Sequence, residues 1–205
     1  MQASAANNSE EKRIFLFGHS FVSRLSREAR RRQRSVLDLV GLPEGCRLSV
    51  QGHPGLTYDR IFTNLGFYLR ILKREPIDTL VVDMGTNDLC DVRITPSVLV
   101  SKVLRFLDLL RTQGVQFQSV VFLTIIERSR VSRPGQVDVS TFNRQARRFN
   151  AAIANRLQDV EGAYCHCQHR ISRKQHLSDG IHLDRDGMDK YCRGLKEAIL
   201  RYLNC

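Results

Sequence analysis

Ser20 stands where a strand-like pattern changes to a helical one. Residues 14–17 are consecutive apolar residues, Gly18 follows them, and after Ser20 the apolar residues recur at helical spacing. A strand, a tight turn and a helix N-terminus place backbone N–H groups and the positive end of the helix dipole beside the serine oxygen. This hydroxyl is therefore the first candidate for a nucleophile.

Asp179 and His182 lie three residues apart in the loop Asp-Gly-Ile-His. A serine nucleophile needs a base, and the base needs a third group that holds its tautomer. On a tight loop the Asp179 carboxylate can reach Nδ1–H of His182, which leaves Nε2 free to face Ser20. Taken alone, the pair has a commoner structural interpretation, a capping aspartate and a polar loop histidine. His53 and His176 are competing bases, but neither has a carboxylate at comparable spacing.

Two other loops carry candidate donors for the negative charge that acyl transfer places on a carbonyl oxygen. Asn87 belongs to the Gly-Thr-Asn-Asp run of residues 85–88, and Gly55 follows the apolar residues 48–50. A side-chain amide, or a backbone N–H that no side chain shields, suits this task. Each is also an ordinary turn former. Asp88 is expected to fix its loop rather than to take part in the chemistry.

Alternating strand and helix patterns must position these residues. Apolar, strand-like runs occupy residues 14–17, 48–50, 79–83, 120–126 and 163–167, and helical periodicity occupies residues 21–34, 58–74, 96–113, 140–157 and 185–203. This alternation predicts an α/β fold, a doubly wound three-layer α/β/α sandwich around a five-stranded parallel sheet. In such folds the site lies beyond the carboxyl ends of the strands, where the loops described above would meet.

The ordered set of motifs resembles the SGNH (GDSL-type) hydrolase family over most of the chain. The resemblance implies a flavodoxin-like fold and a serine esterase that acts on small acyl or acetyl esters or lipids, with no metal and no other cofactor. It implies that Ser20 is the nucleophile, His182 the base and Asp179 its orienter. The implied oxyanion donors are the N–H of Ser20, Gly55 and Asn87.

The residue before the serine departs from the family pattern, which usually has aspartate where this chain has His19. The hydrogen bonding and local charge of this loop must therefore differ from those of the family. A variant serine loop on a strongly basic chain is similar to esterase domains in the first-open-reading-frame proteins of some LINE-type retrotransposons.

The chain is strongly basic, with a net charge of +11, and 26 of its 32 basic residues are arginine. Arginines cluster at residues 24–34, 128–133 and 144–148. Guanidinium groups suit phosphates and anionic headgroups, although a solvated helix face explains any single cluster. The alternative prediction is a catalytically weak hydrolase fold that binds nucleic acid or an anionic membrane. The sequence indicates no oligomeric state.

Length and composition favour one domain. A chain of 205 residues can bury one core, so we expect a single domain at residues 13–205 after a disordered leader at residues 1–12. No apolar run approaches the ~20 residues that span a bilayer, and no signal-peptide pattern is present, so a cytoplasmic or nuclear location is expected. A turn is expected at Pro134-Gly135 in the basic loop of residues 127–139.

The six cysteines lack the dense spacing of a disulfide scaffold and are expected to be reduced thiols. Cys165, Cys167 and His169 alternate along one short segment. Structural zinc sites need turn-spaced pairs and a fourth ligand, so this segment is interpreted as a partly buried edge strand.

Overall fold

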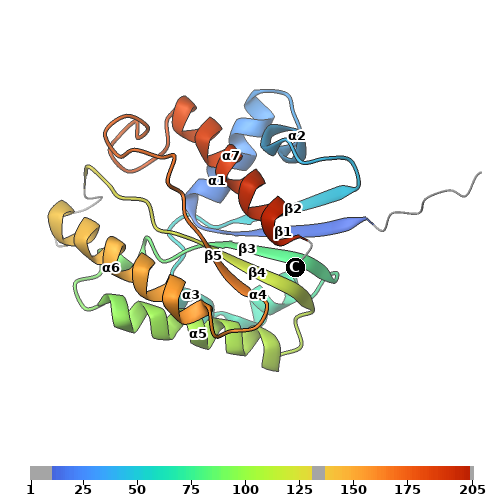
Figure 1. Cartoon of the computed structure of the whole chain (residues 1–205), viewed down its shortest axis with the longest axis horizontal. Helices are drawn as coiled ribbons and strands as arrows, with labels where there is room; N and C mark the ends of the chain where they lie inside the picture. Colours follow the sequence, from blue (N-terminus) through green and yellow to red (C-terminus); the bar gives the residue numbers. More distant parts are fainter. Residues whose placement is uncertain (1–10, 131–136, 204–205) are drawn as a thin grey trace, which may run out of the picture.

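The computed structural model describes residues 11–130 and 137–203 and shows a parallel five-stranded sheet between two layers of helices (Figure 1). The strands lie in the order β2-β1-β3-β4-β5, and each neighbouring pair is parallel. Their bounds are β1 Lys12–Gly18, β2 Cys46–Gly52, β3 Ile77–Asp83, β4 Phe117–Leu123 and β5 Ala163–His166. This topology confirms the predicted flavodoxin-like, doubly wound α/β/α sandwich.

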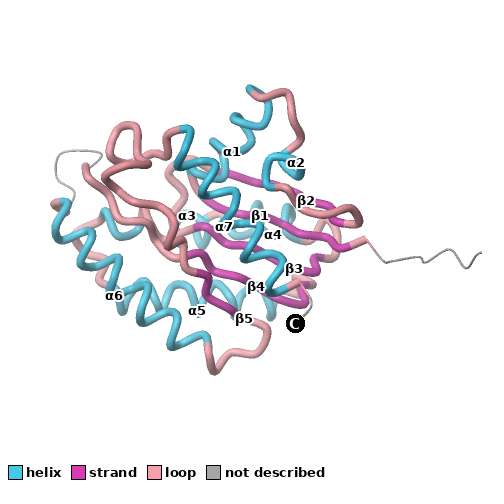
Figure 2. Tube along the Cα trace, turned by 45° about the horizontal axis from the view of Figure 1, so that its top comes forward, coloured by secondary structure: helices cyan, strands magenta, loops and turns pink. Residues whose placement is uncertain are grey.

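The helices divide between the two faces of the sheet (Figure 2). One face is covered by α1 (Ser20–Arg31), α2 (Val36–Val40) and α7 (Arg185–Tyr202), and the other by α3 (Tyr58–Thr63), α4 (Leu65–Leu72), α5 (Pro96–Thr112) and α6 (Val139–Leu157). Successive strand residues point to opposite faces, so Leu16 of β1 packs with α1 and α7 while Phe17 packs with α4 and α5. A short 3-10 helix, η1 (Asp88–Cys90), follows β3.

The prediction of one helix at residues 58–74 is wrong in one respect, because the structure has two helices there, which meet at Asn64. The Asn64 backbone has φ −113° and ψ 34°, and its side-chain amide donates to the carbonyl of Arg60 at 3.0 Å. A side chain that bonds to the nearby backbone competes with the regular helical ladder. Helix α2, which Ser35 caps, was not predicted, because five residues are too few for a periodic pattern.

Several smaller expectations concern the ends and edges of the fold. Strand β1 already includes Lys12, the last residue of the predicted leader, and residues 1–10 lie outside the described part. The turn expected at Pro134-Gly135 also lies outside it. Cys165 is half-buried in edge strand β5, and the five described cysteines are unpaired.

Two observations on the described residues concern metal binding and membrane spanning. No group of His, Cys, Asp and Glu side chains there could hold a metal ion. No described helix is both long enough and apolar enough to cross a membrane.

Candidate active site

The loops that carry Ser20, Gly55 and Asn87 follow three neighbouring strands and lie at the carboxyl-terminal end of the sheet. Ser20 follows β1, Asn87 follows β3, and Gly55 follows β2 on the other side of β1. The strand order reverses between β1 and β3, and such a reversal opens the crevice in which doubly wound folds bind their ligands. The order of the strands therefore brings the serine and the candidate oxyanion donors to this crevice.

Hydrogen bonds to main-chain carbonyls tie these three loops together. The N–H of His19 donates to the carbonyl of Asp83 at 3.1 Å, which links the ends of β1 and β3. The N–H of His53 donates to the carbonyl of Gly18 at 2.8 Å and links the ends of β2 and β1. The Asn87 amide donates to the carbonyl of Leu56 at 3.0 Å and links the loop after β3 to the loop after β2.

Asp88 adds a fourth tie, in which its Oδ1 accepts the N–H of Tyr58 at 3.1 Å. This bond fits the loop-fixing role expected for Asp88. Its other oxygen, Oδ2, is buried without a hydrogen-bond partner in the described residues. The carboxyl group is consequently held in an unfavourable place for a charge.

The three candidate oxyanion donors each have an N–H hydrogen without an acceptor in the described residues. Ser20 is the first residue of α1, and its N–H has no acceptor among the described residues. The N–H of Gly55 also has none there, and Gly55 adopts a φ of +72° that favours glycine. Asn87 uses one amide hydrogen on Leu56, which leaves the second for a ligand.

Asp179 holds His182 through side chain and backbone together. Oδ2 of Asp179 lies 2.8 Å from Nδ1 of His182, and Oδ1 accepts the N–H groups of Ile181 at 3.0 Å and His182 at 2.7 Å. Burial opposes ionisation of Asp179, but these hydrogen bonds outweigh it and hold the pKa of the carboxyl well below its usual range. Nδ1 of His182 therefore carries the proton toward Asp179, and Nε2 is the nitrogen left for chemistry.

The loop of His182 is fixed from a second direction. The N–H groups of Ser129 and Arg130 both donate to the carbonyl of Gly180, at 2.9 and 3.2 Å. A Cβ on Gly180 would lie 2.8 Å from side-chain atoms of the same two residues. The segment after β4 therefore sets the position of the Asp179–His182 pair.

The nucleophile candidate and the base candidate are not hydrogen-bonded to each other in the described residues. Oγ of the half-buried Ser20 instead lies 3.3 Å from Nδ1 of its neighbour His19. Catalytic hydrogen bonds in ligand-free sites are often long and tighten when substrate binds. The contact with His19 was not predicted.

The two competing histidines are occupied elsewhere. Nδ1 of the buried His176 accepts the N–H of Ser172 at 2.8 Å, so this ring holds its own loop. Nε2 of His53 lies 3.0 Å from the Gln51 amide nitrogen, and burial together with the nearby Arg60 lowers the pKa of His53. Neither ring contacts a carboxylate in the described part of the chain.

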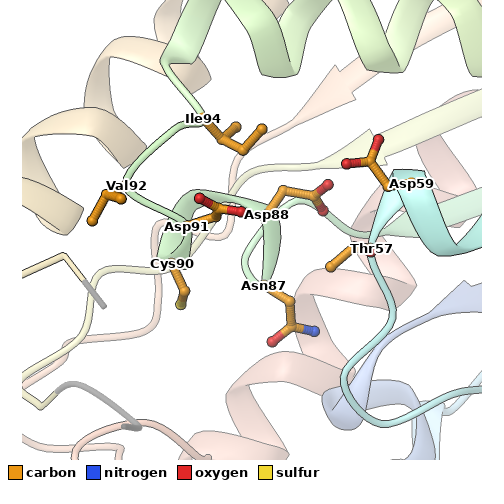
Figure 3. Close-up of a pocket in the computed structure, with 8 residues that line it drawn as sticks. All are labelled: Thr57, Asp59, Asn87, Asp88, Cys90, Asp91, Val92 and Ile94. Carbon is orange, nitrogen blue, oxygen red and sulfur yellow. The ribbon is translucent and has the colours of Figure 1, made fainter. Parts of the chain in front are cut away.

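An acidic pocket of about 320 Å³ adjoins the candidate oxyanion donors (Figure 3). Its lining side chains are Thr57, Asp59, Asn87, Asp88, Cys90, Asp91, Val92 and Ile94. In Figure 3 the amide of Asn87 and the carboxyl group of Asp88 extend in different directions from adjacent backbone positions. Burial raises the pKa of Asp88 to about 7 from an ordinary 3.8, even though the Tyr58 N–H bond and Lys102 act in the opposite direction.

This shift gives a prediction for stability. Because the folded state binds the Asp88 proton more tightly than the unfolded state, Asp88 destabilises the fold increasingly as pH rises from about 4 to about 7. Asp88→Asn keeps an acceptor for Tyr58 and removes the titration. Its free energy of unfolding, measured in urea, should rise relative to the parent across this range, by at most about 4 kcal/mol.

Asp91→Asn is the matched control, since Asp91 lines the same pocket and Arg93 lowers its pKa to about 2. Its difference from the parent should stay constant between pH 5 and 7, where Asp91 is ionised in both the folded and the unfolded state. A constant difference for Asp88→Asn over the same range would show that Asp88 is ionised throughout.

Comparison with known proteins shows the fold and leaves the sequence family open. No protein-family model matches the sequence, and no curated protein sequence matches it. A carbohydrate acetylesterase family member from Sinorhizobium meliloti superposes with a TM-score of 0.71 at 16% identity, covering 95% of this chain and 100% of that chain. A carbohydrate esterase family 3 protein from Talaromyces cellulolyticus gives 0.65 at 15% identity, with 94% and 98% covered.

A member of the lipolytic protein G-D-S-L family from Veillonella parvula DSM 2008 gives a TM-score of 0.62 at 12% identity, with 93% of this chain and 97% of that chain covered. Identities this low establish the fold alone. The chain therefore has the three-layer fold that these esterase and lipolytic proteins share, over nearly its whole length.

Proposed function

We propose that the protein is an SGNH-type serine esterase that hydrolyses small acyl or acetyl esters through an acyl-enzyme. The observation that carries the proposal is the 2.8 Å contact between Asp179 and Nδ1 of His182, which leaves Nε2 as the free nitrogen. The fold shared with solved acetylesterases supports the same reaction class.

In the proposed reaction, Oγ of Ser20 attacks the acyl carbon at the positive end of α1. The N–H groups of Ser20 and Gly55 and the Asn87 amide stabilise the negative charge on the carbonyl oxygen. His182 acts as the general base of the site, and Asp179 holds its tautomer and balances the imidazolium charge.

Cys165 and Cys192 are poor candidate nucleophiles. Burial raises the pKa of Cys165 and Cys192 to about 12, so both remain protonated thiols near neutral pH. A probe selective for activated serine therefore tests the proposal directly. A fluorophosphonate should modify Ser20, identified by peptide mass spectrometry, and should leave the Ser20→Ala variant unlabelled. Labelling at another serine would contradict the assignment.

The oxyanion role of Asn87 gives a further prediction. Asn87→Ala should lower kcat for a p-nitrophenyl ester by about 10²- to 10³-fold, because one donor to the developing charge is lost. Asn64→Ala is the matched control, since the Asn64 amide also donates to a main-chain carbonyl, on α3, away from the serine loop. If Asn87→Ala lowers only the melting temperature and not kcat, then Asn87 serves as a loop tie.

A second candidate function rests on the arginines beside the proposed site. Arg24, Arg27 and Arg185 line a hollow of about 200 Å³, and none of the three pairs with a carboxylate within the described residues. The same hollow is lined by Arg31 and by two acidic residues, Glu28 and Asp184, so its arginines outnumber its carboxylates by four to two. Such a surface suits a polyanion, either nucleic acid or an anionic membrane. The resemblance to retrotransposon esterase domains, which stays a prediction, would favour nucleic acid.

Replacing these three arginines by glutamine should weaken binding to single-stranded nucleic acid and reduce the salt slope by two to three units. The control replaces Arg144, Arg148 and Arg156 of α6, on the opposite face of the sheet, and removes the same charge. Fluorescence anisotropy over a salt series measures both, with anionic vesicles as a parallel ligand. Equal losses in the two triple variants would assign the effect to net charge alone.

A further inference from the structure

A histidine other than His182 contacts the proposed nucleophile. His19 lies between β1 and α1, and only 1% of its surface is exposed. Its Nδ1 lies 3.3 Å from Oγ of Ser20, and its Nε2 lies 3.2 Å from Oδ1 of Asp83. The angle at Nε2 falls short of a well-formed hydrogen bond, so this second contact is chiefly electrostatic.

Asp83 is in turn held from the far side. The hydroxyl of Tyr191, on α7, donates to Oδ2 of Asp83 at 2.6 Å. Burial, with the Asp83 charge beside it, raises the pKa of Tyr191 well above its usual value, so the phenol keeps its proton and remains a donor. Tyr191, Asp83 and His19 thus form one buried chain that ends at the serine oxygen.

The backbone determines which nitrogen of His19 is free. The N–H of Phe21 points at Nδ1 at 3.4 Å, so Nδ1 carries a lone pair and the ring proton lies on Nε2, facing Asp83. The Ser20 hydroxyl can act only as a donor toward Nδ1, where it shares the lone pair with the Phe21 N–H, and transfer of the proton to Nδ1 breaks the Phe21 contact. This is the arrangement of a general base, a nitrogen acceptor beside the nucleophile with a carboxylate behind the ring.

A purely structural role explains less of this arrangement. As a helix cap, His19 needs only the contact with Phe21. A carboxylate such as Asp83, which is 6% exposed, is costly to bury unless a positive partner forms beside it. A charged His19 ring would give the Asp83 carboxylate such a partner during the reaction.

We infer that His19 is a second general base of the proposed esterase, and that it takes the proton of Ser20 during acylation. As Oγ bonds to the acyl carbon, the hydroxyl proton moves to Nδ1 of His19, and the imidazolium faces Asp83. When the bond to the leaving oxygen breaks, the His19 imidazolium gives this proton to the departing alcohol. In deacylation, Nε2 of His182 takes a proton from the attacking water and gives it to Oγ as the acyl bond breaks, so both rings end neutral, as they began.

The inference rests on the proposed function, and a burst experiment separates the two. p-Nitrophenolate leaves without a proton, so with p-nitrophenyl acetate the His182→Ala variant should still release about one p-nitrophenol per molecule, acylated at Ser20, before slow turnover. The same variant should have lost steady-state hydrolysis of an alkyl acetate, because deacylation needs the His182 base. Adding His19→Asn should slow the burst by at least ~10²-fold.

Asparagine is the informative replacement at His19, since its side-chain oxygen can still accept the Phe21 N–H but cannot take a proton. A burst in His182→Ala no faster than in Ser20→Ala, or one that His19→Asn does not slow, would overturn the inference and leave the esterase proposal standing. A wild-type protein that neither hydrolyses the ester nor reacts with fluorophosphonate would refute both.

Asp83 and Tyr191 are positioning residues in this scheme, and their effect should appear in the rate and not in binding. In the His182→Ala background, Asp83→Asn should lower the burst rate constant at saturating ester and leave the half-saturating concentration unchanged. Tyr191→Phe should do the same to a smaller degree, with Tyr202→Phe on the same helix as its control. Equal rates in all of these folded variants would assign the chain a structural role only.

Discussion

Replacement of Ser20 by alanine is expected to abolish ester hydrolysis and to leave the fold intact. The proposed acyl-enzyme forms on Oγ of Ser20, and loss of a serine nucleophile lowers kcat by at least about 10⁴-fold in enzymes of this mechanism. In the described residues, Oγ of Ser20 forms a hydrogen bond only with His19. Alanine at position 20 therefore removes a partner of that ring and of no other described side chain. Initial rates with p-nitrophenyl acetate and a thermal melt measure the two effects.

Ser23→Ala is the matched control, because Ser23 lies one turn further along α1 and outside the proposed chemistry. It should hydrolyse the ester at the parental rate. Parental turnover by Ser20→Ala would remove the serine mechanism and would leave the fold as a scaffold for binding alone.

Replacement of Asp179 by asparagine is expected to have the next largest effect, a fall in kcat of about 10⁴-fold. An asparagine oxygen can still accept the N–H groups of Ile181 and His182, so the loop should keep its shape. The amide NH₂ would then face Nδ1 of His182 where Oδ2 now accepts a proton. The ring would shift its proton to Nε2, and the site would lose its free nitrogen.

The expected signature of Asp179→Asn is a folded protein with a low kcat at all pH values where the parent is active, and with a lower melting temperature, because the ionised Asp179 carboxylate stabilises the folded state. Asp184→Asn is the control on the same loop, since Asp184 caps α7 through Gly187 and asparagine caps equally well. A small loss of activity in Asp179→Asn would show that another group orients the base. Comparable losses in both variants would show a general effect of the loop.

The sheet could be predicted from the sequence because its signals are local. Each strand is a short apolar run, and the helices between them repeat their apolar residues at helical spacing, which together define a doubly wound fold. The break at Asn64 could not be predicted, because the apolar spacing of α3 continues into α4 across it. Helix α2 is too short to show a period.

The proposed site also has one part that the sequence could predict and another that it could not. The Asp179–His182 pair is local, and its contact lies within three residues of chain. The chain from His19 through Asp83 to Tyr191 joins residues 64 and 108 positions apart, from the turn between β1 and α1, from β3 and from α7. The sequence singled out His19 as a departure from a family pattern, but only the packed fold shows the carboxylate that accompanies it.

The ties between the loops at the end of the sheet have a consequence for divergence. Three of them end on main-chain carbonyls, those of Asp83, Gly18 and Leu56, and two of these start from a main-chain N–H. Every residue except proline has both of these groups, so most side chains of the loops can be substituted while these hydrogen bonds are kept. The geometry of these loops therefore depends little on the side chains that they carry, and the same fold can occur at 16% identity without a match between the sequences.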